Sequence, residues 1–175
     1  MADELEAFLK RPAVGLATAG LLAVDLALSW LILVARRTLD GVTVVPGLLD
    51  IRFLWNRGIS FSLLWQSSSF GSWALAIFQT GVSVFLLRWA VRTPKLFLTG
   101  SLVCIAAGAL GNVASRLFYG AVFDYFEFHL GDVPFFVFNI SDVLISAGVV
   151  GILVETVWPT RWTLPTDDTA GAPGA

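Results

Sequence analysis

Residues 108–142 carry two aspartates, Asp124 and Asp142, at the two ends of an apolar connection. Acidic side chains next to membrane-length apolar runs are costly to bury, so they indicate a function. Two carboxylates that lie close together cannot both ionise at low cost, so such a pair keeps one proton and titrates as a unit. Its ionised member can take a proton from water while its protonated member polarises a carbonyl. This chemistry hydrolyses a peptide bond without a metal or another cofactor.

Amide and guanidinium side chains accompany the two aspartates at helical spacing. Asn112 and Arg116 are four residues apart, and Asn139 precedes Asp142 by three, so each pair shares one face of a helix. The first pair ends one apolar segment, the second pair begins the next, and Asp124 lies in the loop between them. The end of one segment and the start of the next share a side of the membrane. These side chains can therefore converge near one membrane surface.

Spacing alone leaves three interpretations of the aspartates open. An Asp at the start of a helix is a common N-cap, so Asp142 has a structural explanation, and Asp124 has one as an ordinary loop acid. Acids within membranes also serve ion or proton pathways, as in a small transporter. A metal centre is disfavoured, because His129 is the only histidine and the single cysteine, Cys104, lies in an apolar run. We expect His129 to be solvated in a surface loop and Cys104 to be a packing residue.

The composition identifies lipid as the solvent of this chain. Of its 175 residues, 57% are hydrophobic and only 14% are charged, with a mean hydropathy of +0.80. Soluble domains are about 25% charged. The length accommodates one domain with a few spanning helices. The net charge of −2 argues against a nucleic-acid partner.

Four apolar segments approach the roughly 20 residues that a helix needs to cross a bilayer. They cover residues 13–35, 72–91, 96–117 and 135–158. Backbone groups must be satisfied internally in hydrocarbon, so we expect all four segments to be helices. The predicted fold is therefore a membrane all-α domain over residues 1–162, followed by a disordered, Pro- and Gly-containing tail at 163–175.

The loop between the first two segments, residues 36–71, has β-like runs separated by turn residues. We expect a small β-sheet there, lying on the membrane surface, with a short interfacial helix or turn at residues 59–66. Residues 119–134 are predicted to add a strand or loop to the same surface structure.

The distribution of basic residues predicts the orientation in the membrane. The short loop between the second and third segments is purely basic, with Arg88, Arg92 and Lys95, so the positive-inside rule places it in the cytoplasm. An even number of spanning segments then leaves both termini inside and the two larger loops outside. The first of these loops also carries basic residues, which oppose this orientation: Arg36, Arg37, Arg52 and Arg57. We give the compact basic loop more weight.

Several boxes of sequence, in order along nearly the whole chain, resemble the lipoprotein signal peptidase family, also called signal peptidase II. The family's G-N-x-x-D-R box is matched by GNVASR at 111–116. Its catalytic Asp follows eight residues after the Arg in a V-V-D-F-like run, here VFDY at 122–125. The final box, F-N-x-A-D, is matched by FNISD at 138–142, and an earlier box, N-x-G-x-x-F-S, by NRGISFS at 56–62.

The resemblance implies an aspartyl endopeptidase of the bacterial inner membrane. Its substrate would be a prolipoprotein whose lipobox Cys carries diacylglyceryl, and its other partners would be membrane lipid and globomycin-type cyclic peptides. Asp124 and Asp142 would be the catalytic dyad, near the periplasmic face. By position, the residues that support the dyad or bind substrate are Asp25, Asn56, Gly58, Asn112, Arg116 and Asn139.

The first helix matches the family only in part. The family has D-Q-x-T-K there; Asp25 matches its Asp, Leu26 replaces the Gln, and Ser29 stands at the Lys position. Asp25 lies in the middle of an apolar segment, so it needs a polar partner. Asn112 and Arg116 are the candidates.

Two further departures fall in the boxes around the aspartates. Ser115 replaces the Asp of G-N-x-x-D-R, and Ser141 replaces the Ala of F-N-x-A-D. Joint loss of the family's Lys, at Ser29, and Asp, at Ser115, is consistent with a lost supporting ion pair, whose replacement by small neutral groups costs little stability. The departures therefore leave the dyad intact and bear on substrate range and rate. The alternative hypothesis is a divergent paralogue of the same fold that is non-catalytic or has an altered substrate.

Overall fold

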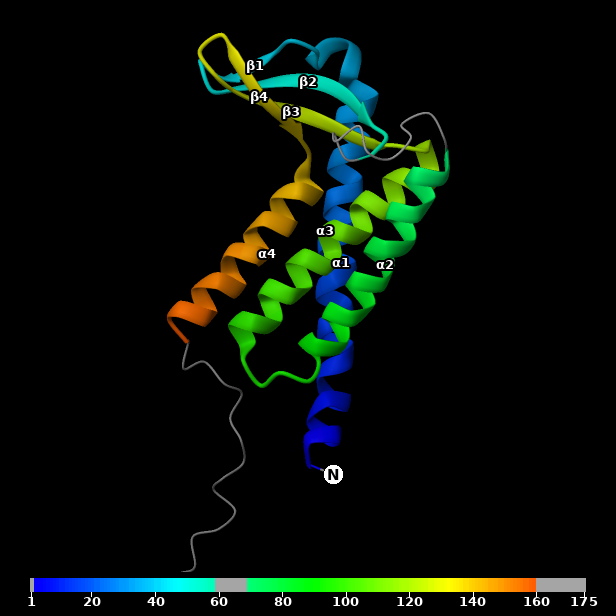
Figure 1. The fold of residues 1–175 in the computed structure, drawn as a ribbon, viewed down its shortest axis with the longest axis vertical. Helices are drawn as coiled ribbons and strands as arrows, with labels where there is room; N and C mark the ends of the chain where they lie inside the picture. Colours follow the sequence, from blue (N-terminus) through cyan, green and yellow to red (C-terminus); the bar gives the residue numbers. More distant parts are fainter. Residues whose placement is uncertain (1, 59–68, 160–175) are drawn as a thin grey trace, which may run out of the picture.

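Four long helices form the body of the protein. The structure is a computed structural model, and it describes residues 2–58 and 69–159. Each helix contains a stretch long and apolar enough to cross a membrane, which confirms the predicted spanning segments. The helices run between the two ends of the molecule, and a small sheet covers one end (Figure 1). They are α1 (Ala2–Leu39), α2 (Ser69–Ala90), α3 (Leu96–Tyr119) and α4 (Ile140–Val157).

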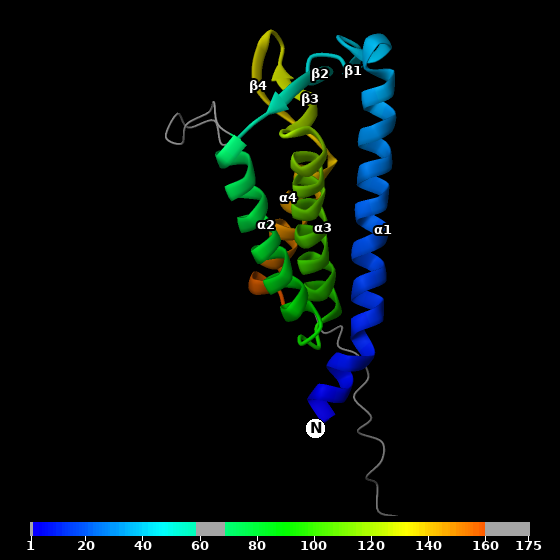
Figure 2. The same cartoon turned by 90° about the vertical axis from the view of Figure 1, so that its right-hand side faces the viewer.

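Helix α3 is the centre of the bundle. It packs against α1, α2 and α4, and a larger share of it is buried than of any other spanning helix. Figure 2 shows α3 between α1 and α2. The backbones of α3 and α4 approach closely where one of them has glycine: a Cβ at Gly148 would collide with the backbone oxygen of Ser101, and one at Gly108 with that of Ser141. Small residues allow such close packing between helices in membranes.

The outward faces of the bundle are apolar. Leu31 on α1, Ile77 and Phe85 on α2, and Leu153 on α4 are each more than half exposed. Contiguous exposed apolar surface of this kind is disfavoured in water, and lipid satisfies it. The exposed side chains therefore agree with the composition in identifying a membrane protein.

The sheet is built from both of the larger loops. Its strands are β1 (Thr43–Val45), β2 (Leu49–Asn56), β3 (Val122–Leu130) and β4 (Val133–Phe138), all antiparallel, in the order β1-β2-β3-β4. The first two strands follow α1, and the last two precede α4. The expected surface sheet is thus confirmed, and residues 119–134 do contribute to it, with a nine-residue strand and the beginning of another. The pairing of β2 with β3 ties the two loops together above the helix ends (Figure 1).

The predicted start of the fourth helix is wrong. We expected a helix over 135–158, but residues Val133–Phe138 form β4 and α4 begins only at Ile140. The physical reason is local: Pro134 lacks an N–H, and the aromatic and β-branched residues after it favour a pleated strand. Asn139 then caps α4 with its side chain, which sets where the helix begins.

The remaining boundaries differ less. Helix α1 extends beyond the predicted 13–35 at both ends, because flanking residues outside the apolar core also continue the helix. The interfacial element expected at 59–66 lies outside the described residues, and so does the tail expected at 163–175.

Candidate active site

The polar side chains singled out in the sequence converge where the sheet meets the helix ends. Asp124 lies on β3, Asp142 in the first turn of α4, and Asn112 near the end of α3. Asn56 ends β2, and it is paired with Val122, two residues before Asp124. Asn56 and Asp124 are therefore diagonal neighbours across the β2–β3 pair, a separation that polar side chains can bridge.

Asp124 is almost completely buried, with 1% of its surface exposed, and it is held by two amides. The Nδ2 of Asn139 donates to Asp124 Oδ1 at 2.7 Å, and the Nδ2 of Asn56 donates to Asp124 Oδ2 at 3.1 Å. Asn56 is oriented in turn by the backbone N–H of Gly58, which donates to its Oδ1 at 3.1 Å. Each carboxylate oxygen of Asp124 thus has a fixed donor.

Asp142 is held by the helix start and by α3. The Nδ2 of Asn112 donates to Asp142 Oδ1 at 3.0 Å, and the backbone N–H of Asn139 donates to Asp142 Oδ2 at 3.2 Å. Asn139 and Asp142 form a reciprocal capping box, in which the backbone N–H of Asp142 donates to Asn139 Oδ1 at 3.0 Å. The capping interpretation of this aspartate is therefore correct in part: Asn139 is the N-cap and Asp142 its partner.

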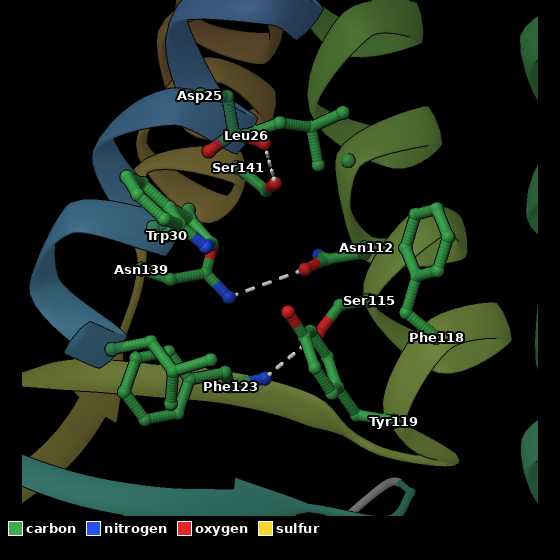
Figure 3. Close-up of a pocket in the computed structure, with 13 residues that line it drawn as sticks. Asp25, Leu26, Trp30, Asn112, Ser115, Phe118, Tyr119, Phe123, Asn139 and Ser141 are labelled. Atoms are coloured by element: carbon green, nitrogen blue, oxygen red, sulfur yellow. Dashed lines mark hydrogen bonds between the residues drawn. The ribbon is translucent and has the colours of Figure 1, made fainter.

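Asn139 links the two aspartates. Its side chain donates to Asp124, its backbone N–H donates to Asp142, and its Nδ2 also reaches Asn112 Oδ1 at 3.2 Å (Figure 3 shows the last contact). One capping residue thus positions carboxylates from a strand and from a helix. This places the pair in a single hydrogen-bonded cluster at the sheet-bearing end of the bundle.

The environment of Asp124 favours its protonated form. Burial raises the pKa of Asp124 from 3.8 to about 6, and the negative charge of Asp142 also raises it. Hydrogen bonds from Asn56 and Asn139 and the charge of Arg116 act in the opposite direction, and burial outweighs them. A carboxyl with this pKa is able to hold a proton in weakly acidic solution beside a second carboxylate.

Arg116 lies next to the cluster and is bound to its scaffold. Its Nη1 donates to Gln79 Oε1 at 2.9 Å and to the backbone oxygen of Asn112 at 3.3 Å. It therefore connects α2 to the turn of α3 that carries Asn112. Gln79 is a site neighbour that we did not predict; a polar residue in the apolar run of α2 was the available signal.

The predicted partners of Asp25 are wrong. Its Oδ2 accepts a hydrogen bond of 2.7 Å from Ser141 Oγ, in place of one from Asn112 or Arg116 (Figure 3). Gly111 makes this contact possible, because a Cβ there would collide with both Asp25 and Ser141. The serine that departs from the family's F-N-x-A-D box is thus the residue that pairs with Oδ2 of this buried acid.

The other two serines each have a partner of their own. Ser29 Oγ lies 3.3 Å from the hydroxyl of Tyr125, and Tyr125 also accepts from the backbone N–H of Ile140 at 3.2 Å. Ser115 Oγ donates to the oxygen of Ala121 at 3.0 Å and accepts from the N–H of Phe123 at 3.1 Å. The structure accommodates these departures with local hydrogen bonds. Tyr125, fully buried, is a residue that sequence reasoning missed, although a tyrosine in a phenylalanine-rich strand was a signal.

His129 is not solvated in a loop as we expected. It lies on β3 with a side chain only 12% exposed, its Nε2 is 3.4 Å from Asp50 Oδ1, and its Nδ1 is 2.8 Å from the oxygen of Gly131. The contact with Gly131 and the charge of Asp50 raise the pKa of His129.

Within residues 2–58 and 69–159, no group of three His, Cys, Asp or Glu side chains is arranged to hold a metal ion.

The fold and this cluster define a multi-pass membrane protein with paired carboxylates where a surface sheet meets the helices. Residues 17–158 match the family model for signal peptidase (SPase) II. The chain therefore belongs to the signal peptidase II family, a family of peptidases of bacterial membranes, as the sequence boxes had indicated.

Similar proteins agree with this assignment. The chain is 39% identical over 128 residues to a lipoprotein signal peptidase of Methylobacterium sp. (strain 4-46), covering 73% of this chain and 78% of that one. It is 38% identical over 125 residues to one of Methylorubrum extorquens (strain PA1), covering 71% and 72%. A bacterial membrane enzyme solved by the in meso method at 1.9 Å resolution superposes with a TM-score of 0.71 and 23% identity, covering 85% of this chain and 95% of that one. This last similarity shows a shared fold.

Proposed function

We propose that this protein is an aspartyl endopeptidase that removes the signal peptide from diacylglyceryl-modified prolipoproteins, with Asp124 and Asp142 as its catalytic residues. The observation that carries the proposal is the double contact of Asn139, whose side chain donates to Asp124 and whose backbone donates to Asp142. A carboxylate pair held by one residue at the end of a membrane bundle is suited to hydrolysis of a peptide bond near the membrane surface.

The environments of the two aspartates favour different roles. Burial raises the pKa of Asp124 to about 6, so Asp124 is the proton holder that polarises the scissile carbonyl. Asp142 lies in the first turn of α4 and accepts hydrogen bonds from Asn112 and from the backbone of Asn139. These contacts fix the side chain of Asp142 beside Asp124, and we assign to Asp142 the removal of the proton from the attacking water.

The surroundings of the pair support the proposed substrate. Asn56 ends β2, the strand paired with the one that carries Asp124, and Gly58 follows two residues later. We assign both residues to binding of the substrate backbone. Trp30 on α1 and Phe118 on α3 are exposed and form an apolar surface beside the site. Diacylglyceryl chains can approach from the bilayer along this surface. Membrane lipid and globomycin-type cyclic peptides are the other ligands that we assign to this apolar surface.

We propose that the cluster faces the periplasm and that both chain termini are cytoplasmic. The basic residues Arg88, Arg92 and Lys95 lie at the end of the bundle opposite the sheet, the end where α1 begins and α4 finishes (Figures 1 and 2). The positive-inside rule places that end in the cytoplasm. The sheet and the aspartates then lie on the side to which prolipoproteins are exported.

The test is cleavage of a prolipoprotein by the purified protein in lipid or detergent. We expect cleavage immediately before the diacylglyceryl-modified Cys, and little cleavage of the same precursor without the lipid. Expression of the chain should also restore prolipoprotein processing in a bacterium depleted of its own signal peptidase II. Failure of both experiments, with the protein present in the membrane, would favour the non-catalytic paralogue.

The raised pKa of Asp124 predicts how cleavage depends on pH. Because Asp124 must carry a proton to polarise the carbonyl, we expect kcat/KM to fall as the pH rises through about 6. The free energy of unfolding should change in the same direction. The stability contributed by protonated Asp124 is complete below the ordinary aspartate pKa of 3.8 and is lost as the pH rises through about 6. Cleavage rates and melting temperatures measured from about pH 4 to about pH 8 check this. A value of kcat/KM that stays constant across this range would contradict the assignment of the proton to Asp124.

A further inference from the structure

The hydroxyl of Tyr125 joins β3 to the start of α4. Tyr125 directly follows Asp124 on β3, and its side chain is fully buried. Its oxygen accepts a hydrogen bond of 3.2 Å from the backbone N–H of Ile140. Ile140 is the first residue of α4, and it directly follows the N-cap Asn139. The Tyr125 hydroxyl therefore contacts the backbone segment that carries Asn139 and Asp142.

This contact gives a partner to one of the N–H groups at the start of α4. The first N–H groups of a helix have no acceptor within the helix, so each needs one from outside. Asp142 supplies an acceptor to the N–H of Asn139, and Asn139 supplies one to the N–H of Asp142. The N–H of Ile140, which lies between them in sequence, donates to Tyr125. Without the phenol oxygen, the N–H of this half-buried residue loses its partner, which is costly.

Ring packing and a second hydroxyl hold the phenol of Tyr125 in position. Its ring packs against Phe123 and Phe126, with centroids 5.5 and 4.9 Å away. Ser29 Oγ, on α1, lies 3.3 Å from the phenol oxygen. Burial raises the pKa of Tyr125, so the phenol keeps its proton. It can therefore donate this proton to Ser29 while it accepts from Ile140, and the first hydrogen bond strengthens the second.

Both hydroxyls stand where the chain departs from the family's sequence pattern. Tyr125 occupies the Phe position of the V-V-D-F-like run, and Ser29 occupies the Lys position of the first helix. The two positions are 96 residues apart in the chain, yet their hydroxyls meet beside the start of α4. A phenylalanine at position 125 would offer no acceptor to Ile140 and no donor to Ser29. The two departures thus form one hydrogen-bonded unit.

We propose that Tyr125 is a positioning residue of the candidate active site: its hydroxyl, oriented by Ser29, holds the first turn of α4 so that the aspartate of this turn faces Asp124 in the reactive arrangement. The inference rests on the proposed function. Tyr125 acts through the backbone, because a shift of the Ile140 N–H also moves Asn139, which donates to both aspartates. A displacement of reacting groups by about 1 Å lowers the rate by about 100-fold, so this one hydrogen bond has a large effect on turnover.

Tyr125→Phe removes the hydroxyl and keeps the ring. We expect kcat for prolipoprotein cleavage to fall by about 10- to 100-fold while KM changes by less than about twofold, because the carboxylates are displaced and the substrate contacts remain. A change that only destabilised the protein would lower its melting temperature and leave kcat per folded molecule unaltered.

Thr99→Val is the matched control for the loss of a hydroxyl between two elements. Thr99 Oγ1 donates to the backbone oxygen of Ala90 at 3.3 Å and so joins α3 to α2. This contact lies at the end of the bundle opposite the sheet (Figure 2). The control variant should keep kcat within about twofold of the wild-type value, because the proposed reaction centre is at the other end.

Substitutions at position 29 test whether the two hydroxyls act as one unit. Ser29→Thr keeps a hydroxyl and Ser29→Val has the same shape without one, so their difference isolates the hydrogen bond to Tyr125. We expect Ser29→Val to have a kcat about threefold or more below that of Ser29→Thr. In the Tyr125→Phe background the two variants should have equal kcat values, because the partner hydroxyl is already absent. A difference that is just as large in this background would overturn the coupling.

Hydrogen exchange measures the contact with α4 without turnover. In Tyr125→Phe we expect the amide of Ile140 to exchange about tenfold or more faster than in the wild type, while the amides of α2 are unaffected. Unchanged exchange at Ile140 would overturn the hold of Tyr125 on the helix start. If Tyr125→Phe does not fold, the Ser29 variants decide the inference, and equal kcat values for Ser29→Val and Ser29→Thr would overturn it.

The outcomes separate this inference from the proposed function. If the wild-type protein cleaves the lipidated precursor and Tyr125→Phe cleaves it with the same kcat, the inference fails and the proposed function stands. If the wild-type protein cleaves no lipidated precursor, the proposed function fails, and the positioning role fails with it.

Discussion

Replacement of either Asp124 or Asp142 by Asn is expected to reduce kcat/KM for prolipoprotein cleavage by about 10²- to 10⁴-fold. Asn has nearly the shape of Asp, but it can neither take a proton from water nor deliver one to the carbonyl. Each substitution removes one half of the proposed acid–base pair, so the double variant should be little worse than either single variant. Cleavage of a diacylglyceryl-modified precursor at equal protein concentrations measures the effect.

The loss should not reflect unfolding. Asp124→Asn removes a carboxyl whose ionisation is disfavoured by burial, but it also loses one of the two hydrogen bonds accepted from Asn56 and Asn139. These two effects oppose each other above about pH 6, so the variant is expected to stay folded, and its thermal unfolding is measured beside its activity. Asp132→Asn is the matched control, because Asp132 is an exposed acid in the turn between β3 and β4 on the same sheet. It should retain full activity. Undiminished processing by Asp124→Asn or Asp142→Asn would exclude the aspartyl mechanism.

The helices could be predicted because their signal is local. An apolar run of membrane length leaves the backbone no alternative to a helix, and all four runs were recognised from composition. The start of α4 was missed because hydropathy does not distinguish an apolar strand from the beginning of a spanning helix. Residues Val133–Phe138 are as apolar as the helix that follows, and only Pro134 and the Asn139 cap separate the two.

The sheet and the site depend on contacts between distant residues. The strand character of β2 was visible in the sequence, but its pairing with β3 joins residues far apart in the chain. The hydrogen bond from Asn56 to Asp124, for example, joins residues 68 positions apart. The hydrogen bond from Ser141 to Asp25 joins residues 116 positions apart, and no periodicity of the sequence predicts it. Candidate site residues were found from their types and from ordered boxes, whereas their partners required the fold.

Asn139 is the residue whose importance became visible only from its contacts in the folded structure. From the sequence it was one supporting amide among several, but its side chain and backbone contact both aspartates in the structure. We expect Asn139→Ala to reduce kcat/KM by about 100-fold, because small displacements of reacting groups have effects of this size. Loss of the N-cap should also destabilise the protein by about 0.5–2 kcal/mol. Cleavage kinetics and thermal unfolding in detergent measure the two effects.

Asn139→Ser separates these two roles. Serine is about as good an N-cap as asparagine, so this variant should keep most of the stability that α4 draws from its cap. Its shorter side chain cannot span the contact to Asp124 Oδ1 while capping the helix, so activity should fall nearly as far as in Asn139→Ala. Wild-type activity in Asn139→Ser would show that capping alone suffices to position Asp142. Low activity at wild-type stability would instead identify the hydrogen bond from the Asn139 side chain to Asp124 as the contact that aligns the two carboxylates.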